Sequence, residues 1–440
     1  MFLQTDDQTI EDLRIFGKRD SQGLFDLYNH SHTRGAEAVL KEMFTKPLSD
    51  QQEINRRSDI IKNFAAMNMR FPFEGALFDM AEKYLIAADE QKKQGTQHSV
   101  LSEKEISNGV TALITLVQQI KSFIDTREVI AMKSWSKERE AIASLLLDPA
   151  FEPVLREQQK GKISYAAVTA FDLLFRLRER NKIEQLLAQI YQLDVYLSVA
   201  KVARERKFVF PKALEKGKSI LRLKGVYHPE LAKPVSNDFS MDASNNVVFL
   251  TGANMAGKST FLRSVSTAIY VAHIGFPVAA EEMEFSVMDG MYTTINLPDN
   301  LGIGASHFYA EVLRVKKVAA ELEAGKSIFV LFDELFRGTN VKDAHEGTVA
   351  ITKAFAGRTN SLFIISSHIV EAGDELSMKK NIAFHYLPTR MNGNTPIYTY
   401  TLERGITDDR HGMIIIRNEG ILEILEKGKK DLQGERLGTH

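Results

Sequence analysis

Residues 249–265, FLTGANMAGKSTFLRSV, contain a glycine-rich loop that few folds can accommodate. The loop places Gly252, Gly257, Lys258 and Ser259 at the spacing G-x-x-x-x-G-K-S. An apolar run, NNVVFL, leads into it and a helical pattern follows, and in that setting the backbone N–H groups of such a loop face phosphate oxygens. The segment therefore predicts a strand, a phosphate-binding loop and a helix within an α/β domain.

The loop residues also predict how a nucleoside triphosphate is held. Gly252 and Gly257 allow the backbone to approach the phosphates because they carry no Cβ atom. Lys258 would neutralise the β- and γ-phosphates, and the Ser259 hydroxyl would bind Mg²⁺. We expect the phosphates to lie against a continuous run of residues: Gly252, Ala253, Asn254, Met255, Ala256, Gly257, Lys258, Ser259 and Thr260.

Two later apolar runs end in side chains suited to hydrolysis. SIFVLFDE ends in Asp333, expected to bind Mg²⁺, and Glu334, expected to act as general base on the attacking water. SLFIISSH ends in His368, which we expect near the γ-phosphate because ligands lie at the carboxyl ends of parallel strands. A solvated strand end and a structural histidine are the simpler alternatives. Together these patterns predict an ATP- or GTP-hydrolysing enzyme with Glu334, Lys258 and His368 as catalytic residues.

The two halves of the chain have different patterns. Residues 1–215 contain few glycines and repeat apolar side chains at helical spacing, for example Ala36, Val39, Leu40, Met43 and Phe44; Ile106, Val110, Ile114, Val117 and Ile124; Ile183, Leu186, Leu187, Ile190 and Tyr191. Residues 216–440 alternate β-rich runs with helical stretches. The β-rich runs are 247–252, 291–296, 327–334, 361–368, 381–387 and 396–402, and the helical stretches are 258–274, 307–324 and 342–357. This predicts an α plus α/β protein, with a helical domain over 1–215 and a P-loop domain with a mainly parallel sheet over 216–440.

Composition narrows the functional classes. The absence of cysteine excludes disulfides, thiolate metal sites and cysteine nucleophiles. No apolar run approaches the roughly 18 residues of a membrane span, and the polar, acidic start does not resemble a secretory signal, so we expect a cytoplasmic protein. The net charge of −1 gives no electrostatic indication of nucleic-acid binding.

Several longer motifs resemble the MutS family of mismatch-repair ATPases. TGANMAGKST, GASHFYAEV, VLFDELFRGTN and SSH resemble its ATPase domain, and Asn254, Met255 and the Gly338-Thr339 turn are marks of that family. Residues 32–64 and 221–231 resemble the opening of its helical lever domain and the junction to the ATPase. Residues 405–421, GITDDRHGMIIIRNEGI, resemble a C-terminal segment that helps to pair subunits.

The resemblance implies ATP and Mg²⁺ as cofactors and a homodimer with composite sites. Ser306 falls at the family's signature serine, which reaches the γ-phosphate of the partner subunit, although a helix N-cap is the simpler alternative. Asp343 matches an acidic residue that faces the neighbouring subunit. Tyr400 falls near the family's adenine-stacking position, with Val235 opposite, although Tyr400 also fits a strand core.

The chain also departs from the family pattern. The lever-like segment begins near residue 10, so we expect neither the mismatch-reading domain nor the connector domain, and the clamp is expected to be absent or rudimentary. Ala256 and Phe336 each replace a family glycine. Candidate DNA-binding clusters are basic and short: 55–62, 176–182, 201–207 and 426–431, for each of which a solvated helix face is the simpler interpretation.

Three functional hypotheses remain open at this level. The first is a MutS-like ATPase that binds DNA and serves mismatch repair or acts on unusual DNA structures through nucleotide-gated lever movement. The alternative is a dimeric ATPase switch that gates protein–protein interactions without DNA. The third is a transporter-type ATPase subunit, against which the lever-like helices and the Asn254-Met255 pair count.

Overall fold

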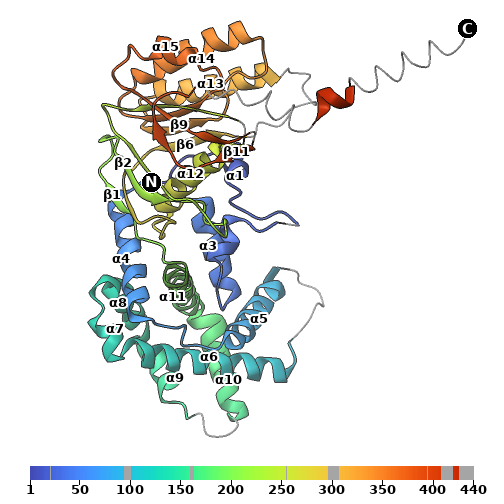
Figure 1. Cartoon of the computed structure of the whole chain (residues 1–440). Coiled ribbons are helices and arrows are strands. Elements are labelled where there is room, and N and C mark those ends of the chain that lie inside the picture. Colours follow the sequence, from blue (N-terminus) through green and yellow to red (C-terminus); the bar gives the residue numbers. More distant parts are fainter. Residues whose placement is uncertain are drawn as a thin grey trace, which may run out of the picture.

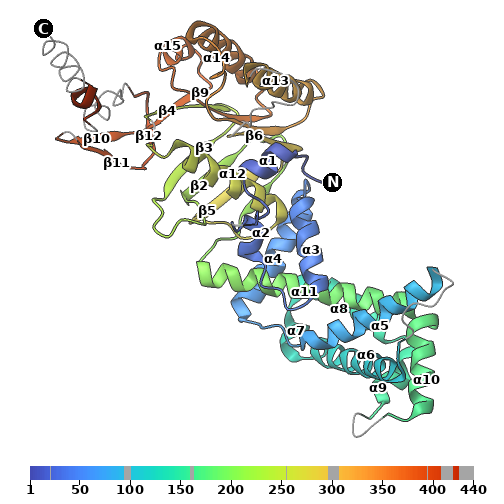
Figure 2. The same ribbon diagram turned by 90° about the vertical axis from the view of Figure 1, so that its right-hand side faces the viewer.

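The computed structural model describes residues 1–19, 21–93, 101–158, 163–253, 255–295, 307–393, 395–407 and 420–425. These ranges form an α/β part and a helical arm, and the long helix α11 (Arg180–Arg206) leads from one to the other (Figure 1). The arm extends away from the sheets, as the turned view shows (Figure 2). Within the described ranges, no helix is both long and apolar enough to span a bilayer.

The arm is built from helices that each bury one apolar face. They are α2 (Leu24–Tyr28), α3 (Arg34–Thr45), α4 (Gln51–Met67), α5 (Gly75–Lys93), α6 (Glu103–Ile124), α7 (Arg127–Ala131), α8 (Ser136–Leu146), α9 (Glu152–Arg156) and α10 (Tyr165–Leu173). The predicted faces are confirmed, because Leu40, Ile114 and Ile190 have no or almost no exposed surface. Val39, Ile106 and Tyr191 are partly buried against the same core.

Side-chain hydrogen bonds determine where helix α3 begins and what it packs against. The Thr33 hydroxyl accepts a hydrogen bond from the backbone N–H of Ala36 (3.2 Å), which caps the helix. Asp194, fully buried in α11, accepts from the backbone N–H groups of His32 and Thr33, each at 2.9 Å. The start of α3 is therefore tied to α11 through a satisfied buried carboxylate.

The larger sheet has six strands in the order β12-β9-β4-β8-β7-β6. Its members are β4 (Val247–Gly252), β6 (Gly290–Thr294), β7 (Ile328–Phe332), β8 (Leu362–Ser366), β9 (Ile382–Leu387) and β12 (Glu403–Arg404). All neighbours are parallel except β12, which pairs antiparallel with β9. Five predicted strands and the three predicted helices, α12 (Lys258–Ile274), α13 (His307–Glu323) and α14 (Val341–Ala356), are confirmed within one or two residues.

Both faces of the centre of this sheet are covered, which explains why β4, β7 and β8 are apolar along most of their length. Val247 and Phe249 of β4 belong to a core shared with α13 and α14. Val248 and Leu250 belong to the other core, which includes α12 and continues into the arm. Figure 1 shows α13, α14 and the short α15 (Ala372–Leu376) together on the outer face. The P-loop helix α12 is thus the element between the sheet and the arm.

A second sheet was not predicted. Its order is β1-β5-β2-β3, with β1 (Lys212–Leu214), β2 (Leu221–Val226), β3 (Asn237–Met241) and β5 (Glu282–Ser286), and only β1 and β5 are parallel. The predicted β-rich run 396–402 is a strand only in its first part, and the prediction was wrong for 399–402. That run supplies β11 (Thr395–Tyr398), which forms a separate hairpin with β10 (Thr389–Asn392). Tyr400 lies after this hairpin, outside any strand.

The division of the chain at residue 215 remains a prediction. Strand β1 ends at Leu214 and already pairs with β5. At the other end, α1 (Asp7–Asp12) lies against β6, far from the tip of the arm (Figure 2). Residues from both halves therefore contribute to the α/β part.

Candidate nucleotide site

The glycine-rich loop joins β4 to α12 at the carboxyl edge of the large sheet. Gly252 has φ +146° and Gly257, which precedes the first turn of α12, has φ +95°. A Cβ atom on Gly252 would lie 3.3 Å from the carbonyl oxygen of Leu387, and one on Gly257 would lie 2.8 Å from the Tyr400 ring. Both positions therefore require glycine for conformational and steric reasons.

Lys258 is folded back into this loop. Its Nζ donates hydrogen bonds to the carbonyl oxygens of Gly252 (2.7 Å) and Ala253 (3.2 Å), and only 6% of the residue is exposed. Burial lowers the pKa of Lys258, and the nearby carboxylates of Asp333 and Glu334 oppose that shift. The amine is thus held within the loop, where a phosphate oxygen could replace a carbonyl partner.

Ser259 and Asp333 meet across the ends of two elements. The Ser259 hydroxyl donates to Oδ2 of Asp333 at 2.6 Å, and the Ser366 hydroxyl donates to Oδ1 of the same carboxylate. Ser366 also accepts from the backbone N–H of Glu334 (3.1 Å). Ser366 was missed in the sequence, although its position at the end of β8, in the predicted run SLFIISSH, could have indicated it.

This pair has the donor chemistry of a Mg²⁺ site. A serine hydroxyl and a carboxylate oxygen are the hard oxygen ligands that Mg²⁺ prefers, and Mg²⁺ usually completes its shell with phosphate oxygens and water. Among the described residues, no group of three or more His, Cys, Asp or Glu side chains is arranged to hold a metal ion. Ser259 and Asp333 therefore fit an ion that arrives with a nucleotide better than a permanent protein cage.

Glu334 and His368 form the second contact at this edge. His368 Nε2 lies 2.6 Å from Oε1 of Glu334, and a guanidinium nitrogen of Arg337 lies 3.8 Å from Oε2. The hydrogen bond from His368 lowers the pKa of Glu334, against the opposing effect of burial. Glu334 adopts φ +61°, a left-handed conformation that is strained for a non-glycine residue and is typical of functional sites.

A cavity of about 300 Å³ opens beside the phosphate loop. Tyr400, 45% exposed and at φ +56°, and Val235 both line it, together with Gly257 and Thr260 of the loop. Asn237 holds the Tyr400 segment in place, because its Nδ2 donates to the Tyr400 carbonyl (3.0 Å). His228 and Lys233 complete the polar part of the wall. Tyr400 and Val235, the two residues predicted to lie on either side of the adenine, therefore line the same cavity.

Two predicted site residues, Asn254 and Ser306, lie outside the described residues. Most of the predicted subunit-pairing segment, 408–419, and the basic cluster 426–431 also lie outside them. Phe308, which belongs to the motif GASHFYAEV, packs on Phe336 with ring centroids 5.7 Å apart. Asp343 donates its backbone N–H to Asn340, which caps α14 (3.0 Å).

The two departures from the family pattern have different structural contexts. Ala256 is buried at 1% exposure. Phe336 adopts φ +63°, the left-handed conformation in which glycine is unstrained. Its ring fits against Gly347 of α14, where a Cβ atom would approach it to 2.9 Å.

Two of the three described basic clusters, 55–62 and 176–182, contain ion pairs with acidic residues. In the cluster 55–62, Arg56 pairs with Glu138, which is 8% exposed. In the cluster 176–182, the pairs are Arg176–Asp172, Arg180–Glu184, Lys182–Asp148 and Lys182–Glu179. These contacts favour the simpler interpretation for both clusters, since part of their positive charge is paired within the arm.

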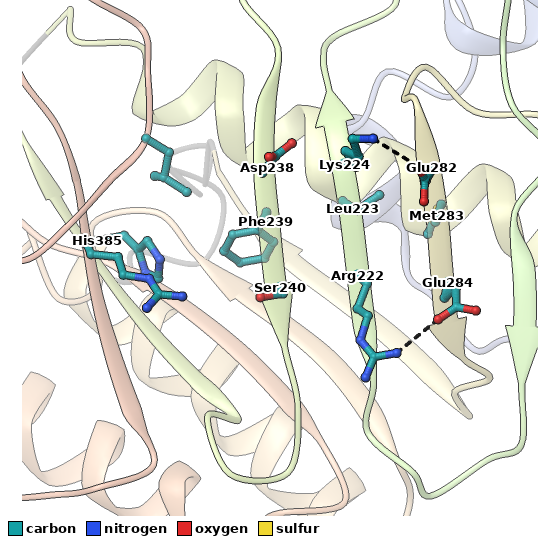
Figure 3. Close-up of a pocket in the computed structure, with 12 residues that line it drawn as sticks. Arg222, Leu223, Lys224, Asp238, Phe239, Ser240, Glu282, Met283, Glu284 and His385 are labelled. Atoms are coloured by element: carbon teal, nitrogen blue, oxygen red, sulfur yellow. Dashed lines mark hydrogen bonds and ion pairs between the residues drawn. The ribbon is translucent and has the colours of Figure 1, made fainter.

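A second cavity of about 530 Å³ lies on the outer face of the small sheet, where β2, β3 and β5 approach β9 and β12 (Figure 3). Arg222 pairs with Glu284 (3.1 Å) and Lys224 with Glu282 (3.1 Å), as Figure 3 shows. Its lining has three basic and three acidic side chains: Arg222, Lys224, Arg404, Asp238, Glu282 and Glu284. It therefore has the character of a solvated, charge-balanced sheet face.

Comparison with known proteins agrees with the geometry of the phosphate loop and its partners. The family model described as MutS domain V matches residues 248–434, and the model described as MutS domain III matches residues 8–200. Together they span most of the α/β part and the arm. The chain belongs to the MutS family.

Individual MutS proteins show the extent of the similarity. The DNA mismatch repair protein MutS of Fusobacterium nucleatum subsp. nucleatum is 29% identical over 261 residues, which cover 58% of this chain and 29% of that protein. The MutS protein of Petrotoga mobilis is 30% identical over 259 residues, covering 57% of this chain and 31% of that protein. The chain therefore aligns with less than a third of the length of these MutS relatives.

Proposed function

We propose that this MutS-family chain is a Mg²⁺-dependent ATPase that serves DNA mismatch repair or acts on unusual DNA structures. The observation that carries the proposal is the contact of Ser259 with Asp333 (2.6 Å), beside Lys258 and Glu334 at one sheet edge. A hydroxyl, a carboxylate, a lysine and a candidate base converging at a glycine-rich loop are what phosphoryl transfer to water requires.

Each residue has a distinct role in this proposal. Lys258 binds the β- and γ-phosphates of ATP, and the loop N–H groups from Gly252 to Thr260 bind the remaining phosphate oxygens. Ser259 and Asp333 would hold Mg²⁺, which when bound neutralises phosphate charge. Glu334 accepts a proton from the attacking water, and His368 orients Glu334 through their 2.6 Å contact.

The lever mechanism is supported by direct contacts between the P-loop helix and the arm. At the end of α12, the Tyr270 hydroxyl donates to the carbonyl oxygen of Phe44 (2.5 Å), and His273 Nδ1 lies 2.8 Å from that of Leu48. Arg57 of α4 donates to the carbonyl oxygen of Ile274 (2.7 Å). A shift of α12 on nucleotide binding would therefore be transmitted to α3 and α4 through short, buried or partly buried hydrogen bonds.

A homodimer completes the proposal. Ser306 immediately precedes α13, and in the MutS-like arrangement it would reach the γ-phosphate of the partner subunit. Nucleotide state would then control how the two subunits and their arms sit together.

One observation favours a second candidate, an ATPase switch that gates protein–protein interactions without DNA. In the clusters 55–62 and 176–182, several basic side chains form ion pairs with carboxylates, as in Arg56–Glu138 and Arg176–Asp172. Paired arginines have less charge available for DNA phosphates, on which salt-dependent binding relies.

ATP hydrolysis measured with and without duplex, branched and mismatched DNA, at low and moderate salt, separates the two candidates. DNA-stimulated turnover that weakens with salt supports the repair function, whereas unchanged turnover and no salt-dependent binding supports the switch.

Two variants test the assigned site residues. Lys258→Ala should lose nucleotide binding, while Glu334→Gln should bind ATP but hydrolyse it at least roughly a hundredfold more slowly. Normal turnover by Glu334→Gln would refute the assignment of the base.

A further inference from the structure

The first residues of the chain form a strap on the edge of the large sheet. Gln4 extends the sheet beyond β6, because its N–H donates to the carbonyl oxygen of Asp289 and its carbonyl accepts from the N–H of Met291, both at 2.8 Å. Residues 5–12 then cross toward α13 and include α1. Figure 2 shows α1 beside β6, on the side from which the arm departs.

Asp6, the N-cap of α1, attaches the strap to α13. Its carboxylate accepts hydrogen bonds from the guanidinium of Arg314 and from Nζ of Lys317 (2.6 Å). Arg314 is only 8% exposed and also donates to the Thr294 hydroxyl (3.1 Å) and the Thr293 carbonyl (2.7 Å). One arginine thus connects the strap, α13 and the end of β6.

Asp12, at the other end of α1, attaches the strap to the exit of β6. It is 3% exposed, and its Oδ2 accepts from the Thr293 hydroxyl (2.9 Å) and from the backbone N–H of Ile295 (2.8 Å). The Thr9 hydroxyl accepts from the backbone N–H of Thr293 (3.0 Å). Side chains of α1 therefore bind the N–H and hydroxyl of Thr293 and the N–H of Ile295 at the end of β6.

The start of the strap is bonded to the base of the arm. Leu3 donates its N–H to the carbonyl oxygen of Pro47 (2.8 Å), and Ser49 donates its N–H to that of Met1 (2.9 Å). Pro47 and Ser49 lie in the short connection between α3 and α4. Residues 1–12 therefore contact the arm at one end and both β6 and α13 at the other.

We propose that this strap is a positioning element that sets α13 relative to β6 according to the position of the arm, with Asp6 as its main positioning residue. The inference rests on the proposed ATPase function, because α13 begins directly after Ser306. In this scheme a movement of the α3–α4 connection is relayed by residues 1–12 to α13, in parallel with the direct contacts of α12. Asp6 makes no hydrogen bond or ion pair with the described residues of the phosphate loop, so it would affect turnover and not nucleotide affinity.

The decisive variant is Asp6→Asn, because asparagine caps a helix as well as aspartate but lacks the charge that pairs with Arg314 and Lys317. Arg314→Met tests the pair from the other side. Lys18→Ala is the matched control, since it removes an exposed ion pair with Glu11 in the same region of the chain without reaching α13. For each variant we would measure the turnover number, the affinity for an ATP analogue, and hydrogen exchange in α13.

Asp6→Asn and Arg314→Met should lower the turnover number about tenfold or more, because small displacements of reacting groups have effects of this size or larger. Affinity for the ATP analogue should stay within about twofold, as expected for an interaction that acts on turnover only. Hydrogen exchange should rise in α13 but not in α14, and Lys18→Ala should resemble the wild type.

Two results would overturn the proposal that the strap positions α13. One is unchanged exchange in α13, which would mean that Asp6 does not hold this helix. The other is a parallel fall of turnover, affinity and thermal stability, which would indicate general destabilisation. If the wild type showed no Lys258-dependent hydrolysis, the ATPase proposal would fail, and the exchange data would still decide whether Asp6 fixes α13.

Discussion

At the scale of single residues, the side chains of the candidate site are held in place by hydrogen bonds to one another. Asp333 receives hydrogen bonds from Ser259 and Ser366, and Glu334 is held by His368. The left-handed backbone of Glu334 (φ +61°) costs free energy that the surrounding contacts must offset. In the proposed ATPase, such preorganisation would place charged groups where phosphoryl transfer needs them without reorganisation during the reaction.

His368→Ala should move the acidic limb of the turnover profile to higher pH. The hydrogen bond from His368 lowers the pKa of Glu334, and burial raises it, so removal of His368 leaves the opposing effect of burial. Less of the base is then ionised at mildly acidic pH. Turnover measured between about pH 4 and pH 8 tests this. Ser367→Ala is the control, because that hydroxyl is bonded to the N–H of Ile369 (3.0 Å); an unmoved limb in His368→Ala would contradict the assigned role.

At the scale of elements, the end of α12 connects the glycine-rich loop to the arm. Tyr270 and His273 reach carbonyl oxygens at the end of α3 and just after it, while Arg57 of α4 reaches back to Ile274. Tyr28 and Phe44 pack on Phe276, with ring centroids 5.7 Å and 5.9 Å away. Polar and aromatic contacts together make α12, α3 and α4 one packed unit.

His273 should make the free energy of unfolding of this unit decrease at acidic pH. Burial lowers the pKa of His273 from 6.5 to about 4, so its stabilising contribution is complete above pH 6.5 and is lost as the pH falls toward 4. At pH 5 the loss amounts to about 2 kcal/mol of unfolding free energy. His273→Asn should remove this part of the pH dependence, as measured by urea unfolding at several pH values.

Tyr270→Phe provides the matched control for His273. It removes a neighbouring hydrogen bond, to the Phe44 carbonyl, without removing a group that titrates in this range. We expect it to lower stability by about 1 kcal/mol at every pH and to leave the pH slope unchanged. If the free energy of unfolding fell equally with pH in His273→Asn and in the wild type, His273 would not be the source of this pH dependence.

At the scale of the whole molecule, the proposed composite site predicts complementation between defective subunits. A mixture of Ser306→Ala and Lys258→Ala chains should regain activity, because a hybrid dimer pairs the intact loop of one chain with the intact Ser306 of the other. With random pairing, half of the dimers are hybrids with one working site, so recovery should reach about a quarter of wild-type turnover. Hybrids that form, as seen by native mass spectrometry, yet remain inactive would place Ser306 in its own subunit's site.

Local sequence signals were sufficient for the phosphate loop, the helical arm faces and five strands of the large sheet. These features depend on spacing within one element: glycines that a loop requires, apolar residues at helical period, and continuously apolar strands buried on both faces. The small sheet escaped prediction because its strands are short and carry charges such as Arg222 and Glu284 on the solvated face. The second part of the run 396–402 was misassigned because its residues, rich in threonine and tyrosine, have the composition of a strand although they form a loop.

Contacts between distant parts of the chain required the folded molecule. Ser366 on Asp333, Tyr400 against Gly257, and the strap from Asp6 to Arg314 join residues separated by 33, 143 and 308 positions. No periodicity encodes such pairs, because each depends on strand order and on how the arm packs against α12. The sequence motifs thus predicted which residue types form the candidate site. Tertiary packing determined which other side chains hold those residues in place and how the arm is attached to the α/β part.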